Sequence, residues 1–153
     1  MRPFIFMAML VILGLTAIPF AGLCQATTNL VKFIKYGTSF GMCSGYCFQE
    51  TLYDSKLIIS LSEYYRGKGQ NNDKPNKVDT VKTDRTKWNS LVKSVDLIKF
   101  YKLPQVIGCP DCADGGAEWI EIGTKNKTYG IEFEHGADIE PIKELLTLIR
   151  REN

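Results

Sequence analysis

The chain has 153 residues, of which 44% are apolar, 11% aromatic and 24% charged. This length suits one domain, and this composition excludes a disordered chain, a collagen and a pure coiled coil. The net charge is only +2 and no run of like charge occurs, so composition gives no support for nucleic-acid binding.

Residues 1–26 have the three-part layout of a secretory signal peptide. Arg2 supplies a positive charge, residues 4–23 are almost all apolar or small, and small residues precede a polar stretch. We predict cleavage after Ala26, with cleavage after Cys24 as the second choice.

Two alternatives keep the N-terminal segment in the protein. Residues 4–23 are long enough to span a bilayer uncut, as a membrane anchor. Cys24 is also a candidate for lipid attachment, although that processing needs a small residue where Leu23 stands. In every case residues 27–153 form one exported domain, periplasmic or extracellular, with no membrane span of its own.

The first part of this domain predicts strands. Residues 30–36 alternate weakly, and residues 37–47 are a loop rich in glycine, serine and threonine. Residues 48–53 and 56–66 are rich in β-branched and aromatic side chains, and they form a hairpin about Asp54 and Ser55.

Residues 67–77 contain no apolar side chain and predict a solvated loop. Residues 78–83 then form a strand that pairs back on the one before the loop. Asp84 caps a helix that ends near Asp96. Its apolar stripe consists of Trp88, Leu91, Val92 and Val95. A short apolar segment follows and stops at Pro104.

The last part predicts a cysteine-bearing loop over residues 108–116 and a hairpin. Alternating apolar residues around Ile120 and Ile131 form its strands, joined at Lys125 and Asn126. Asp138 caps a final helix. The apolar stripe of that helix consists of Ile142, Leu145, Leu146 and Ile149.

This order of elements predicts an α+β fold. Hairpins demand antiparallel pairing, and each helix has one apolar stripe to bury. We therefore expect one antiparallel sheet of 4–6 strands with two helices packed on one face.

Two short motifs stand out within this pattern, Gly41-Met42-Cys43-Ser44-Gly45-Tyr46-Cys47-Phe48 and Phe100-Tyr101-Lys102-Leu103-Pro104. Together they resemble a family of uncharacterised secreted bacterial domains of unknown function that often occur in lipoproteins. The likeness covers roughly Val31 to Arg151. It implies an α+β fold, a bacterial envelope setting and paired opening cysteines, but no activity. Cys109 and Cys112 are additions to the family's pattern.

The four cysteines of the domain are Cys43, Cys47, Cys109 and Cys112. Exported thiols normally oxidise, which favours structural disulfides over a four-thiolate zinc site. A redox-active C-x-x-C needs a helix N-terminus to lower a thiol pKa, and the glycines and acidic residues around Cys112 make a poor one.

Local disulfides are our predicted pairing. Cys109 and Cys112 stand at the ends of a β-turn pattern with Pro110 at its second position, which brings the Cα atoms within about 7 Å. The resemblance favours Cys43 with Cys47. Chain entropy does not select this pairing, because a cross-bridge would contribute about 4 kcal/mol against about 2 for each local bridge.

Three further features have modest interpretations. His135, the only histidine, is expected at an exposed strand end, with nothing to place it near a cysteine. Asn126-Lys127-Thr128 is a glycosylation acceptor only in a eukaryotic pathway. An acidic loop is expected to be a solvated turn rather than a calcium site. Its residues are Asp111, Asp114 and Glu118.

No phosphate-binding loop, HExxH or GxSxG motif occurs, so we assign no catalytic, cofactor or metal residue. The expected function is a non-enzymatic binding or structural module of the envelope, whose partner is a protein, glycan or lipid. The alternative is a thiol-redox or metal-binding protein that uses Cys109 and Cys112.

Overall fold

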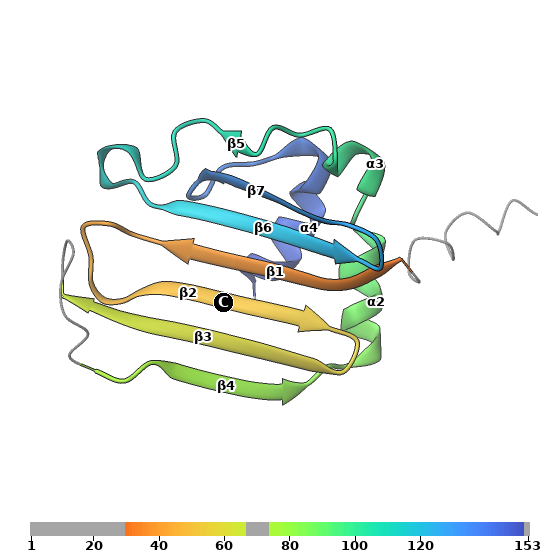
Figure 1. Cartoon of the computed structure of the whole chain (residues 1–153), viewed down its shortest axis with the longest axis horizontal. Helices are drawn as coiled ribbons and strands as arrows, with labels where there is room; N and C mark the ends of the chain where they lie inside the picture. Colours follow the sequence, from red (N-terminus) through yellow and green to blue (C-terminus); the bar gives the residue numbers. More distant parts are fainter. Residues whose placement is uncertain (1–29, 67–73, 152–153) are drawn as a thin grey trace, which may run out of the picture.

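The computed structural model describes residues 30–66 and 74–151, which form an α+β fold (Figure 1). The strands are β1 Val31–Ser39, β2 Ser44–Asp54, β3 Leu57–Arg66, β4 Lys77–Lys82, β5 Val106–Ile107, β6 Ala117–Thr124 and β7 Thr128–Glu134. The α-helices are α2 Arg85–Lys93, α3 Leu97–Phe100 and α4 Lys143–Arg150. Two 3₁₀ turns cover Cys112–Asp114 and Glu140–Ile142.

The described strands form one mixed sheet in the order β4-β3-β2-β1-β6-β7-β5. The expectation of 4–6 antiparallel strands and two helices is wrong in these details, because there are seven strands and three α-helices in the described residues. The additional strand β5 has two residues and pairs in parallel with Glu132 and Phe133 of β7. Two residues are too few to show an alternating pattern, so only the tertiary fold defines this strand.

Helices α2 and α4 lie behind the sheet in Figure 1 and bury their apolar stripes against one face of it. All four stripe residues predicted for α2 are buried, and its predicted cap is confirmed, since the Asp84 side chain accepts a hydrogen bond from the Lys87 backbone N–H. No helix in the described part of the chain is long and apolar enough to cross a membrane.

The turn between β1 and β2 is much shorter than predicted. Residues 37–39 continue β1 and residues 44–47 begin β2, so the expected loop over residues 37–47 is wrong. Gly37 pairs with Glu50 on one side and Trp119 on the other. The Trp119 indole fills the space above Gly37, so a Cβ there would lie 2.1 Å from its Cζ2 atom. Gly37 is thus a packing residue of the sheet.

The last helix also begins later than predicted. A 3₁₀ turn containing Pro141 precedes it, and α4 starts at Lys143, so Asp138 is not its cap. The Asp138 carboxylate instead forms an ion pair with Lys143 Nζ at 2.8 Å. The predicted stripe is confirmed, because all four of its residues are fully buried.

Three other predictions concern β4, the N-terminal segment and the loop before β4. The pairing of β4 with β3 is confirmed, in the register Leu57 opposite Lys82. The signal peptide, the anchor and the lipid site fall in residues 1–29, outside the described residues. Most of the predicted solvated loop, residues 67–73, is outside them too.

Candidate binding pocket

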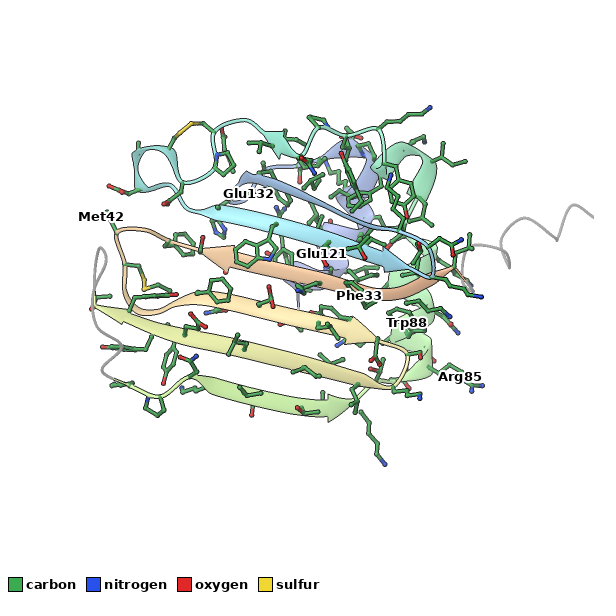
Figure 2. The ribbon with its side chains drawn as sticks, viewed as in Figure 1. Phe33, Met42, Arg85, Trp88, Glu121 and Glu132 are labelled. Carbon is green, nitrogen blue, oxygen red and sulfur yellow. A yellow bond between two sulfur atoms is a disulfide. The ribbon has the colours of Figure 1, made fainter. Side chains whose placement is uncertain are left out.

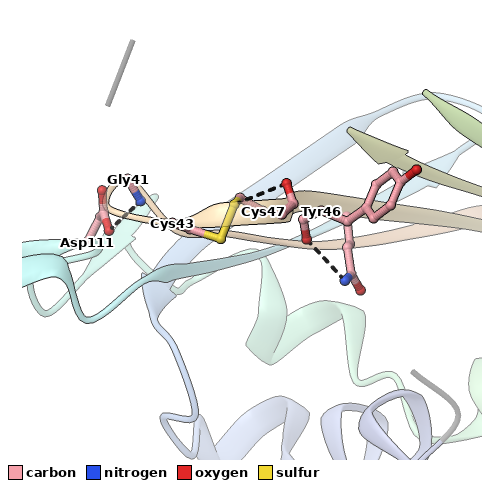
Figure 3. The surroundings of a disulfide bond; sticks show 7 residues. Gly41, Cys43, Tyr46, Cys47 and Asp111 are labelled. Carbon is pink, nitrogen blue, oxygen red and sulfur yellow. Dashed lines mark hydrogen bonds between the residues drawn. A yellow bond between two sulfur atoms is a disulfide. The ribbon is translucent and has the colours of Figure 1, made fainter. Parts of the chain in front are cut away.

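The two cysteine pairs lie at one end of the sheet. The structure joins Cys43 to Cys47 and Cys109 to Cys112, with Cα–Cα distances of 5.8 and 5.4 Å. The predicted pairing of neighbouring cysteines is confirmed. The loops meet where the Gly41 backbone N–H donates to Asp111 Oδ1 at 3.3 Å (Figure 3). Because all four sulfurs are in disulfides, they offer no thiolate to zinc, and the described residues contain no other metal-ligating group of three or more.

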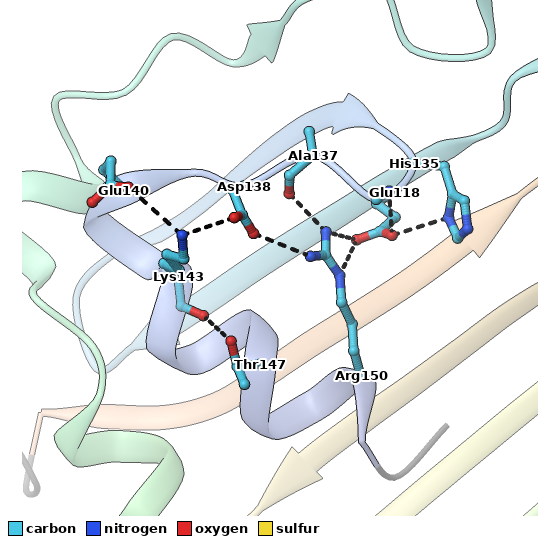
Figure 4. Close-up of polar contacts among 9 residues, drawn as sticks. Glu118, His135, Ala137, Asp138, Glu140, Lys143, Thr147 and Arg150 are labelled. Carbon is cyan, nitrogen blue, oxygen red and sulfur yellow. Dashed lines mark hydrogen bonds and ion pairs between the residues drawn. The ribbon is translucent and has the colours of Figure 1, made fainter.

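A buried carboxylate, Glu118, lies beside these loops. Its side chain is 1% exposed, and each of its oxygens has two polar partners (Figure 4). Oε2 accepts from Nε and Nη2 of Arg150, at 3.1 and 2.7 Å. Oε1 accepts from the backbone N–H of Gly136 at 2.9 Å, and His135 Nδ1 lies 2.9 Å from the same oxygen. The carboxylate is therefore fully satisfied, which is the condition for burying such a group without a large penalty.

Arg150 and Tyr36 complete this cluster. Arg150 Nη2 also donates to the Ala137 carbonyl at 2.8 Å. Burial opposes the charge of Arg150, but its hydrogen bond and attraction to Glu118 outweigh burial and raise its pKa. Burial, with the nearby Glu118 charge, raises the pKa of Tyr36 to about 12. Tyr36 is thus a neutral phenol at physiological pH, and the Glu118–Arg150 pair has no net charge.

A pocket of about 450 Å³ opens above this cluster. The adjacent strands β1, β2 and β6 line one side of it, and the segment after β7 and Arg150 of α4 complete the lining. The lining residues are Tyr36, Thr38, Phe40, Gln49, Thr51, Glu118, His135, Gly136 and Arg150. The volume falls in the range of small-molecule sites.

The pocket wall combines ring surfaces with neutral hydrogen-bonding groups. The Phe40 ring meets the His135 ring edge-to-face, with centroids 4.8 Å apart. Thr38 and Gln49 bring a hydroxyl and an amide to the same space. Such a wall suits a ligand that has both apolar and hydroxylated surfaces and no net charge.

A second, smaller hollow of about 260 Å³ is lined by His135 together with Cys109 and Cys112. His135 directly follows the last residue of β7 and is exposed, as predicted. Its place in one hollow with Cys109 and Cys112 had no signal in the local sequence. Both cysteines are exposed. The Cys109 backbone N–H donates to Glu134 Oε1 at 2.8 Å, so the Glu134 carboxylate lies beside the Cys109–Cys112 disulfide.

The opposite face of the sheet carries a third hollow, of about 290 Å³. It forms above Gly130, where the strand has no side chain, and Trp119, Glu121 and Glu132 surround it. In Figure 2 the labelled Glu121 and Glu132 lie on β6 and β7, on the face turned away from the helices. Phe48 stacks beside Trp119 there, with ring centroids 5.1 Å apart.

Sequence reasoning missed the role of Glu118. It grouped Glu118 with Asp111 and Asp114, but these two are exposed in the loop and Glu118 points into the core. Two signals were present. Glu118 alternates with Ile120 and Ile122, which places all three on one face of a strand. Arg150 stands four residues after Leu146, which places it on the buried stripe of the helix. The glycosylation pattern at Asn126 lies in the exposed turn between β6 and β7.

No family model matches the chain, and no curated protein matches it. The function of the protein is therefore inferred from the geometry of the pocket.

Proposed function

We propose that the protein is an exported, non-enzymatic binding module of the bacterial envelope, and that it holds a sugar unit of a glycan in the pocket beside Tyr36. The observation that carries this proposal is the composition of the pocket wall. Aromatic rings and neutral hydrogen-bonding groups line it, and its two charged groups neutralise each other. The envelope setting rests on the predicted signal peptide and on the family resemblance.

A sugar ring fits this wall by its chemistry. One face of a pyranose presents C–H groups that pack on an aromatic ring, and its hydroxyls both donate and accept hydrogen bonds. Phe40 and Tyr36 supply ring surface, while Thr38 and Gln49 supply polar atoms. A carboxylate or phosphate ligand would find Arg150 already bound to Glu118 through two donors. An uncharged ligand avoids this competition at Arg150. It meets Gln49 through Oε1, because Gln49 Nε2 already donates to the Tyr46 carbonyl at 3.4 Å.

Polar groups converge on this pocket, as they do in active sites, but most are bound to each other. Glu118 and Arg150 form their own pair, and the Thr51 hydroxyl lies 3.1 Å from that of Ser60. His135 is oriented by Glu118 through Nδ1, and its ring packs edge-to-face with Phe40. This supports recognition rather than turnover, because catalysis needs a nucleophile or acid–base pair aimed at the bound substrate.

The test is binding of a panel of mono- and disaccharides, measured by saturation-transfer NMR and then by calorimetry. We expect at least one sugar to bind, and Thr38→Val with Gln49→Met to weaken that binding about tenfold. Thr128→Val with Gln105→Met makes the same changes outside the pocket and should leave binding unchanged. Hydrolysis of the bound sugar by the wild type, lost in His135→Asn, would contradict a non-enzymatic role.

A thiol-redox role of Cys109 and Cys112 is the second candidate function. The observation in its favour is that this exposed disulfide shares a hollow with His135. The carboxylates of Glu134 and Asp111 beside the pair disfavour a thiolate, so we rank this function below binding. Catalysed reduction of insulin disulfides, lost in Cys109→Ser, would reverse the ranking.

A further inference from the structure

The end of the sheet opposite the cysteine loops is strongly basic. Strand register brings to this end the start of β1, the β2–β3 turn, the end of β4, the start of α2 and the β6–β7 turn (Figure 1). These segments carry six exposed cations. They are Lys32, Lys56, Lys82, Arg85, Lys125 and Lys127, which we call the basic end.

The basic end keeps its charge. The same segments hold two acidic residues, Asp54 and Asp84, against the six exposed cations and the half-buried Lys87. Both carboxylates accept hydrogen bonds from backbone N–H groups, since Asp54 accepts from the Leu57 N–H at 2.7 Å and Asp84 caps α2. In the described residues no ion pair within 4.0 Å involves any of the six cations.

Exposed apolar side chains lie among these cations. Leu30 is 48% exposed, Leu57 37% and Val81 57%. A surface that mixes lysines with aliphatic groups suits the boundary of a lipid bilayer, where the charges meet headgroups and the apolar groups reach the acyl region. Nucleic-acid phosphates offer no partner to the aliphatic groups.

The position of Leu30, the first described residue, agrees with this surface. Leu30 lies at the basic end, so the apolar residues 4–23, where they are retained as an anchor, join the domain at this end. Thr38 of the sugar pocket stands six strand residues from Lys32, or roughly 20 Å away along β1. A membrane at the basic end would therefore lie roughly 20 Å from the pocket.

We propose that the basic end docks on an anionic phospholipid surface. The six cations supply the electrostatic attraction, and the exposed aliphatic side chains between them add apolar contact. This interaction is independent of what the pocket binds, so it can fail or hold without the proposed function.

The experiment uses the protein as the exporting cells produce it and measures its cosedimentation with vesicles of phosphatidylcholine alone or mixed with phosphatidylglycerol. Any contribution of residues 4–23 is common to both compositions and to all variants. We expect stronger binding to the anionic vesicles, which added salt weakens. A triple variant, Lys56→Gln with Lys82→Gln and Lys125→Gln, should bind the anionic vesicles about a hundredfold more weakly, at about tenfold per 1.4 kcal/mol.

The matched control removes three charges elsewhere, with Lys74→Gln, Lys77→Gln and Arg151→Gln, and should bind like the wild type. Replacement of the same three basic-end lysines by arginine should preserve binding, and far-UV circular dichroism reports whether each variant folds. Equal loss in the two glutamine variants would overturn the proposal, because net charge alone would then explain binding. Equal wild-type binding to both lipid compositions, or tighter binding to duplex DNA than to vesicles, would overturn it too.

Discussion

Arg150 donates two hydrogen bonds to a single carboxylate oxygen of Glu118, and this contact fastens the end of α4 to strand β6 (Figure 4). The arginine side chain is 25% exposed and the glutamate side chain 1% exposed. The pair therefore lies at the boundary between the core and the pocket, where it both closes the fold and forms part of the pocket wall.

Breaking this pair should destabilise the protein strongly. Arg150→Met leaves the buried Glu118 carboxylate without its counter-ion, and we expect a loss of about 3 kcal/mol in the free energy of unfolding. Glu118→Gln with Arg150→Met should lose less than the sum of the single variants, by more than about 1 kcal/mol. Urea unfolding measures all three. Additive losses would show that the two side chains act independently.

The pH dependence of stability should reveal Tyr36. Its pKa is about 12 in the folded protein against 10.0 for an unperturbed tyrosine, so the unfolded chain loses its phenol proton first. The contribution of the Tyr36 phenol to the free energy of unfolding is complete below pH 10 and falls by about 3 kcal/mol as the pH rises towards 12. Tyr36→Phe should lack this part of the decline. Parallel stability curves for the two proteins over that interval would contradict the assignment.

Two glycines of the sheet should respond differently to alanine. At Gly37 an added Cβ would lie 2.1 Å from the Trp119 ring and 2.8 Å from the Gln49 carbonyl oxygen, so Gly37→Ala should cost about 1–3 kcal/mol. At Gly130 the nearest atom is 3.5 Å from such a Cβ, an ordinary contact. Gly130→Ala is the matched control and should cost less than about 1 kcal/mol. Equal melting temperatures of the two variants would refute this packing.

The N-terminal prediction is tested by sequencing the exported product. Cleavage after Ala26 gives a chain that begins at Thr27, and cleavage after Cys24 gives one that begins at Gln25. An intact Met1 in the membrane fraction would establish the anchor instead. A lipid-modified Cys24 would establish the lipoprotein.

Local patterns were enough to predict much of the fold. The α2 stripe, the β2–β3 hairpin and the β6–β7 hairpin each depend on residues close together in the sequence, where periodicity is visible. The prediction of a loop at Gly37 was wrong because Gly37 makes space for the Trp119 ring, and Trp119 lies on a strand distant in the sequence. A flexible residue in a loop and a space-making residue in a strand have the same sequence signature.

The site was harder to predict than the fold. Glu118 and His135 come from β6 and from the segment after β7, and Arg150 comes from the last turn of α4. Their meeting depends on how α4 crosses the sheet, which no local pattern encodes. An acidic residue in a strand is usually solvated, so only its alternation with isoleucines marked Glu118 as buried.

Chemical-shift mapping of a bound sugar on the ¹⁵N-labelled protein tests the central claim most directly. With the tightest-binding sugar of the panel, we expect the largest amide shifts at Thr38, Phe40 and Gly136, which line the pocket beside Tyr36. Shifts confined to Trp119, Glu121 and Gly130 would place the sugar on the opposite face of the sheet and would contradict the proposed sugar site.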